Sequence, residues 1–114
     1  MMLPCLNATA TAVPDLGPAG SGAFYEFGGF PTTGERMAVY RREAPRLAGR
    51  AVDALTQKTG SLQGVTHLIV TTCTGFYAPG IDIDLVKHAG LSPQVKRTVI
   101  GFMGCYAALT GLRQ

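Results

Sequence analysis

The sequence predicts an α/β fold built around two buried parallel strands. Two short apolar runs rich in β-branched residues, at 66–72 and 97–102, are typical of strands that are covered on both faces. Helical periodicity precedes the first run, separates the two runs and follows the second. The order helix, strand, helix, strand, helix implies a right-handed βαβ unit.

Composition excludes several classes of protein. The 114 residues are 46% hydrophobic and 15% charged, which is typical of one globular domain. A net charge of +3, spread along the chain, is too mild for a nucleic-acid-binding protein. No apolar run approaches the roughly 18 residues of a membrane span, and the first residues lack the features of a signal peptide, so we expect a cytoplasmic protein.

The cysteines fit neither a disulfide framework nor a metal site. The chain has three, Cys5, Cys73 and Cys105, at wide spacing and without a CxxC pair. We therefore expect no disulfide scaffold and no metal.

The first element is a long helix after an irregular leader. Residues 1–23 are rich in Ala, Thr, Pro and Gly without periodicity, and we expect them to be poorly ordered. Thr32 and Glu35 have the spacing of a capping box. Pro45 lies inside the helical pattern, where we expect a kink or a break, and Gly60 closes the segment. Apolar residues at three- and four-residue spacing form the core stripe, namely Met37, Tyr40, Ala44, Leu47, Ala48, Ala51 and Leu55.

Basic residues on this helix could suggest phosphate or nucleic-acid binding. Their helical spacing instead favours a solvated face. They are Arg36, Arg41, Arg42, Arg46 and Arg50.

The remaining elements follow in order. After the strand at 66–72, Pro79-Gly80 precedes a second helical stripe that ends at Gly90. The strand at 97–102 leads through a sharp junction into a third helix, which begins in the segment YAALTGL. Because two strands that are apolar on both faces need neighbours on each side, we expect the chain to be part of a larger structure.

Cys105 is the residue best placed for chemistry. It follows Gly104 at the end of a strand and the start of a helix. Helix N-terminal amides favour the reactive thiolate, glycine permits a strained turn, and the carboxyl ends of parallel strands are where α/β sheets build their sites. The alternative is that Cys105 is a small buried hydrophobic residue.

Several segments in fixed order resemble type III polyketide synthases, the chalcone and stilbene synthase family. The resemblance covers residues 24–114, and its earlier part resembles bacterial alkylresorcinol and alkylpyrone synthases. The matching segments are FPTTGERMAVYRREAPRLA at 30–48, THLIV at 66–70, T-G-x-x-x-P-G at 74–80, D-x-x-L-x-x-x-x-G-L at 82–91, VKR at 95–97 and G-C-Y-A at 104–107.

The resemblance implies part of the N-terminal half of a thiolase-like αβαβα sandwich that forms a homodimer. It implies that Cys105 accepts an acyl group from an acyl-CoA thioester, which is then condensed with decarboxylated malonyl-CoA, without a bound cofactor. The family's catalytic His and Asn have no matching positions here, so we assign His67 and His88 to structure. The CoA-binding residues are not identified. We therefore expect the chain on its own to be inactive.

The same resemblance indicates three cavity positions. Cys73 lies where the side chain lines the substrate cavity, Thr74 follows it, and Ala78 occupies the position of a methionine that reaches across the dimer in plant members. Ala78 would leave room for a long acyl chain. Two alternatives stay open, a ketoacyl-ACP synthase III-like condensing enzyme and a non-catalytic fragment. The starter group, the number of extensions and the mode of cyclisation are not specified by these residues.

Overall fold

The computed structural model describes residue 24 and residues 28–114. The expected leader at 1–23 and most of the aromatic segment that follows it lie outside these residues. The described elements, in chain order, are α1 (Thr33–Thr59), β1 (His67–Thr72), α2 (Ile81–His88), β2 (Lys96–Gly101), the 3₁₀ turn η2 (Gly104–Tyr106) and α3 (Ala107–Gly111). The predicted order of helices and strands is confirmed; β1 starts one residue later than expected and ends where expected, and β2 starts and ends one residue earlier.

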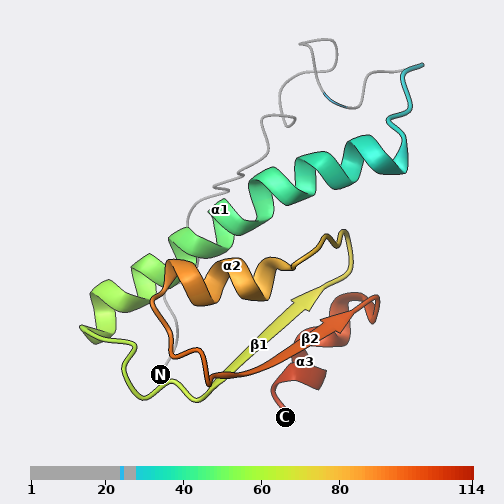
Figure 1. Cartoon of the computed structure of the whole chain (residues 1–114). Helices are drawn as coiled ribbons and strands as arrows, with labels where there is room; N and C mark the ends of the chain where they lie inside the picture. The colour runs from blue at the N-terminus through green and yellow to red at the C-terminus, as the bar shows by residue number, and fades with distance from the viewer. Residues whose placement is uncertain (1–23, 25–27) are drawn as a thin grey trace.

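These elements form three layers (Figure 1). Strands β1 and β2 pair in parallel, with Ile69 opposite Thr98 and Thr71 opposite Ile100. Helix α3 packs on the sheet face that presents Ile69, Thr71 and Ile100, because Gly111 approaches these three side chains. Successive strand residues face opposite sides, so Thr72 faces the other layer, where its hydroxyl bonds to Tyr40 of α1. Helices α1 and α2 therefore cover one face and α3 covers the other.

Helix α1 begins as its sequence predicts. The Thr32 hydroxyl accepts a hydrogen bond from the Glu35 amide, and the Glu35 carboxylate accepts one from the Thr32 amide. Of the kink or break expected at Pro45, a break does not occur, because the helix continues through it. A proline removes one backbone hydrogen-bond donor, and the hydrogen bonds of the long helical segments on both sides keep the helix continuous.

The strands are less buried than predicted. No residue of β1 or β2 is fully buried, and Val99 is 50% exposed. Among the described residues the buried apolar ones are Ile81 and Leu85 of α2, Ala107 of α3 and Val95, which directly precedes β2. The prediction of burial on both faces is wrong for the described residues, because the helices on the two faces leave every strand residue at least partly exposed.

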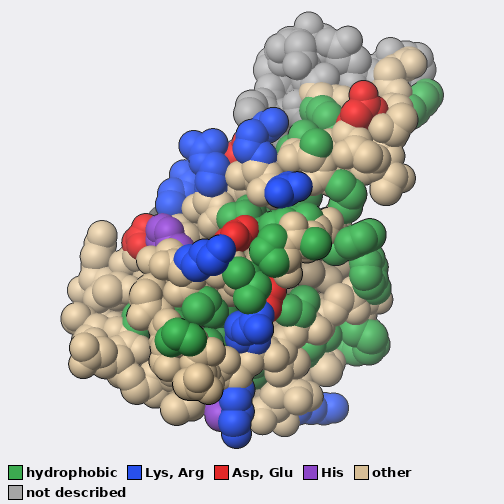
Figure 2. All heavy atoms as spheres, viewed as in Figure 1, with side chains coloured by type: hydrophobic (Ala, Val, Ile, Leu, Met, Phe, Trp, Pro, Cys, Tyr) green, Lys and Arg blue, Asp and Glu red, His purple; other side chains and the backbone are tan. Residues whose placement is uncertain are grey.

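The surface of α1 carries the basic residues. Figure 2 shows Lys and Arg side chains spread along this helix. All five predicted basic positions of the helix are exposed, which confirms a solvated face. Among the described residues, no helix has the length and apolar character needed to cross a bilayer.

Candidate active site

The two strands end at the same edge of the sheet. Thr72, the last residue of β1, lies opposite Gly101, the last residue of β2. The Phe102 amide donates to the Thr72 carbonyl at 3.1 Å, which extends the pairing by one residue. The segments that follow the strands therefore start side by side at the carboxyl edge, where open α/β sheets place ligands and chemistry.

A strained turn lies between β2 and Cys105. Phe102 has a φ of 58°, a left-handed conformation that costs a non-glycine residue about 1–2 kcal/mol. Gly104 has a φ of 69°, which glycine adopts without that cost. These two residues turn the chain from the strand into η2, and Cys105 is the middle residue of this 3₁₀ turn. Its thiol is free and exposed at the junction.

Close packing of α3 fixes the position of this turn. A Cβ at Gly111 would lie 3.3 Å from Ile69 Cγ2 and 3.4 Å from Thr71 Cγ2, so the absence of a side chain brings α3 onto the sheet. Ala107, two residues after Cys105, is only 3% exposed. Cys105 thus precedes a helix whose inner face is held against β1.

Cys73 lies against the turn that carries Cys105. Its thiol donates a hydrogen bond to the Gly104 carbonyl oxygen at 3.3 Å. The structure therefore brings together the two cysteines expected at this site. Thr74 and Ala78 are exposed on the segment that connects β1 to α2.

A hydrogen-bonded tyrosine supports this connecting segment. Tyr40 of α1 and Thr72 share a hydrogen bond of 2.7 Å, and the Thr72 hydroxyl also donates to the Gly75 carbonyl at 3.3 Å. A Cβ at Gly75 would lie 2.3 Å from the Tyr40 ring, so only glycine fits there. Helix α1 thereby fixes the start of the segment that carries Cys73 and Thr74.

A second tyrosine supports the far end of the segment. The Tyr77 hydroxyl donates to Asp84 of α2, and the Tyr77 ring meets Tyr40 edge-on with centroids 6.2 Å apart. Loss of solvent, together with the hydrogen bond to the Asp84 carboxylate, raises the pKa of Tyr77 far above its ordinary value. Tyr77 is therefore a neutral donor throughout the physiological pH range.

An ion pair joins α2 to β2. Arg97 Nη1 lies 2.6 Å from Asp82 Oδ2, and Asp82 is only 8% exposed. Asp82 belongs to the D-x-x-L segment and Arg97 to the VKR segment. Tyr40 was placed in a core stripe, so its hydrogen bond was missed. The sequence indicated this ion pair only through the acidic residue of the D-x-x-L segment and the basic residues of the VKR segment.

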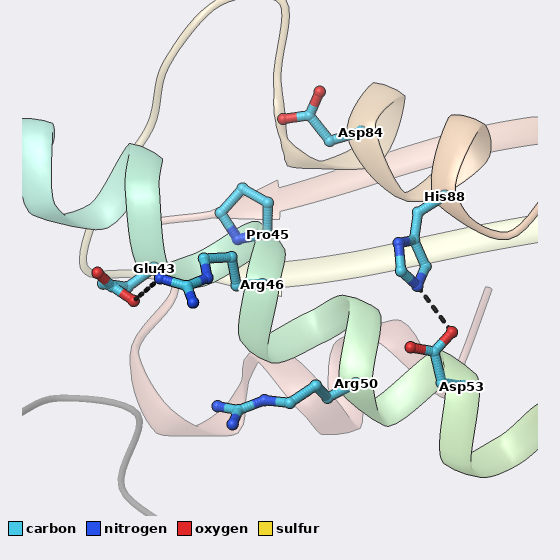
Figure 3. Close-up of a pocket in the computed structure, with 7 residues that line it drawn as sticks. All are labelled: Glu43, Pro45, Arg46, Arg50, Asp53, Asp84 and His88. Carbon is cyan, nitrogen blue, oxygen red and sulfur yellow. Dashed lines mark hydrogen bonds and ion pairs between the residues drawn. The ribbon is translucent and has the colours of Figure 1, made fainter.

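Neither histidine lies at the carboxyl edge of the sheet. His67 begins β1 and bonds to the Thr66 hydroxyl at 2.8 Å. Figure 3 shows His88 of α2 bonded to Asp53 of α1, with Nε2 and Oδ1 2.8 Å apart, and both residues line a pocket of about 650 Å³ between the two helices. None of the predicted site residues lines this pocket. The described residues contain no cluster of His, Cys, Asp and Glu able to hold a metal ion.

Comparisons with known proteins give a family match and related sequences. The model of the N-terminal domain of chalcone and stilbene synthases matches residues 26–114. The chain is 40% identical over 85 residues to the alpha-pyrone synthesis polyketide synthase-like Pks18 of Mycobacterium tuberculosis, covering 71% of this chain and 21% of that protein. It is 36% identical over 84 residues to bisdemethoxycurcumin synthase of Oryza sativa subsp. japonica, covering 73% of this chain and again 21% of the relative.

The structure has a similar counterpart among solved structures. The crystal structure of CsyB complexed with CoA-SH superimposes with a TM-score of 0.68 at 28% sequence identity. The match covers 75% of this chain and 23% of that one. The chain thus spans about a fifth of the length of the curated relatives and about a quarter of the solved structure.

Proposed function

Because the chain belongs to the chalcone and stilbene synthase family, we propose that it supplies the nucleophile of a type III polyketide synthase, with Cys105 as the acyl acceptor. The family and its thiolase-like α/β fold are as the sequence predicts. The observation that carries the proposal is the free, exposed thiol of Cys105 in a strained turn at the carboxyl edge of a parallel sheet.

The chemistry proposed for Cys105 is acyl transfer. Its thiolate attacks the carbonyl carbon of an acyl-CoA, the CoA thiolate leaves, and a thioester forms on the protein. Malonyl-CoA then loses CO₂, and the resulting carbanion displaces the cysteine from the acyl group. A covalent intermediate divides one difficult condensation into two easier steps. Each step passes through an oxyanion that needs preorganised donors.

Residues after β1 are proposed to line the acyl cavity. Cys73 contacts the turn that holds Cys105, and Thr74 and Ala78 follow on the same segment. The small Ala78 side chain leaves space for a long acyl starter. The name of the mycobacterial relative, which refers to alpha-pyrone synthesis, supports a product of that class.

The isolated chain is proposed to catalyse no turnover. It spans about a fifth of its relatives, and neither histidine of the described residues lies beside Cys105. Oxyanion donors and the remainder of the cavity would come from the other four-fifths of such an enzyme, which we propose to be a cytoplasmic homodimer.

A chimera tests this proposal. Residues 26–114 replace the matched segment of the mycobacterial relative, and the chimera is incubated with a long-chain acyl-CoA before peptide mass mapping. We expect the acyl group on Cys105 and none in a Cys105→Ser variant, whereas Thr74→Ser is still acylated. A folded chimera that carries no acyl group on Cys105 would refute the proposal. Labelling by acyl-ACP in preference to acyl-CoA would favour the ketoacyl-ACP synthase III-like alternative.

A further inference from the structure

Two free cysteines lie at the carboxyl edge of the sheet, Cys73 directly after β1 and Cys105 in the 3₁₀ turn that follows β2. The Cys73 sulfur lies 3.3 Å from the Gly104 carbonyl oxygen, and Cys105 is the next residue. A carbonyl oxygen lies about 2.8 Å from the Cα of the following residue across a trans peptide, which puts the Cys73 sulfur within about 6 Å of the Cys105 Cα. Both cysteines are exposed residues.

We propose that Cys73 and Cys105 are a redox-active pair that a hydroperoxide closes into a disulfide. One thiolate attacks the peroxide O–O bond, forming a sulfenic acid and releasing water or an alcohol. The second thiolate then attacks the sulfenic sulfur, the S–S bond forms, and the hydroxide leaves as water after taking up a proton. The two sulfurs together lose two electrons, and the peroxide gains them.

The geometry of the two segments favours closure. A disulfide needs Cα atoms about 4.4–6.8 Å apart and sulfurs in direct contact. Cys73 directly follows β1, whose last residue is paired with β2, so its backbone is held beside the second strand. Gly104 precedes Cys105 and gives that turn rotational freedom. Closure therefore requires rotation of the two side chains together with movement of the turn at Gly104.

The hydrogen bond fixes where the Cys73 thiol lies. It points toward the backbone of the residue that directly precedes Cys105. Cys5 lies outside the described residues, and no role is given to it. Its replacement leaves a chain with two thiols and removes alternative pairings.

The consequence of closure concerns the acyl acceptor, and this part rests on the proposed function. A disulfide to Cys73 removes the Cys105 thiolate, so oxidation blocks acylation reversibly. It also protects Cys105 from further oxidation to sulfinic and sulfonic acids, which thiols do not reverse. Cys73 would thus be both a cavity residue and the partner that preserves the nucleophile.

The test uses the full chain carrying Cys5→Ser, treated with a small excess of hydrogen peroxide and examined by intact mass and peptide mapping. We expect loss of two hydrogen atoms, one cross-linked peptide pair containing residues 73 and 105, and full recovery of iodoacetamide labelling after a dithiol reductant. Addition of oxygen atoms to either cysteine without a cross-link would overturn the proposal.

Two controls separate the folded geometry from chance pairing. The same chain in concentrated guanidinium should close at least about ten-fold more slowly, because its thiols have a lower effective concentration. Equal rates would overturn the proposal. A further Cys73→Ser replacement should convert the product to sulfinic acid at Cys105. These oxidation experiments contain no acyl-CoA, so their outcome does not depend on whether Cys105 is an acyl acceptor. That question is tested separately with the chimera.

Discussion

The ion pair between α2 and β2 gives a quantitative prediction. Replacing Arg97 with methionine keeps most of the aliphatic stem and removes the guanidinium that lies 2.6 Å from Asp82 Oδ2. The Asp82 side chain, only 11% exposed, is then left without its ionic partner. We expect α2 to loosen from β2, the strand that leads into the Cys105 turn.

The magnitude follows from the burial of the two groups. Removing one partner of a fully buried pair costs about 3–5 kcal/mol. The Arg97 side chain is 38% exposed, so water screens part of this charge, and we expect about 2 kcal/mol. At about 1.4 kcal/mol per factor of ten, this corresponds to a roughly 30-fold increase in local opening. An additional Asp82→Asn substitution should recover most of the loss, because it removes the unpaired charge.

Amide hydrogen exchange followed by mass spectrometry measures this opening in peptides that contain β2. The matched control is Lys96→Met, which removes the neighbouring charge; Lys96 is exposed and makes no ion pair within the described part of the chain. We expect the control to exchange like the wild type. Exchange in Arg97→Met within two-fold of the control would refute a structural role for the pair.

Three further results are expected. Gly111→Val should lower the thermal midpoint, because the added methyl groups crowd the sheet face and reduce the free energy of unfolding by about 1–3 kcal/mol. An unchanged midpoint would contradict the packing of α3. Tyr40→Phe should cost about 1 kcal/mol through its lost hydrogen bond to β1, seen as faster amide exchange at 73–80; unchanged exchange there would argue against this support. Hydrogen bonds from Thr32 hold the pKa of Glu35 below its ordinary value of 4.5, so this cap stabilises α1 fully above that pH and is lost as pH falls through the lowered pKa. An NMR titration of Thr32→Ala should move the Glu35 midpoint up toward the ordinary value, and no movement would contradict the capping box.

Local sequence patterns predicted most of the elements. The capping box at Thr32 and Glu35, the strand runs and the glycine before Cys105 are signals carried by neighbouring residues, so they could be read from the chain. The expectation at Pro45 was a kink or a break, and the helix is not broken there, because a single proline removes one hydrogen bond from a long helix.

Long-range partners could not be predicted in the same way. Periodicity places Tyr40 on an inner face, and it does not show that its hydroxyl meets Thr72, 32 positions away. The contact between Cys73 and Gly104 depends on the register of β1 and β2, which residue types alone do not specify. The burial of the strands was overestimated, because the apolar content of a strand shows that it can be buried. It does not show which elements cover it.

The central claim is that Cys105 is the acyl-accepting nucleophile. Its most direct test is peptide mass mapping of the chimera after exposure to acyl-CoA, with Cys73 and Cys105 resolved on separate peptides. The account predicts an acyl thioester on Cys105 that hydroxylamine removes and that Cys105→Ser abolishes. An acyl group found on Cys73 instead, or on neither cysteine of a folded chimera, would contradict it.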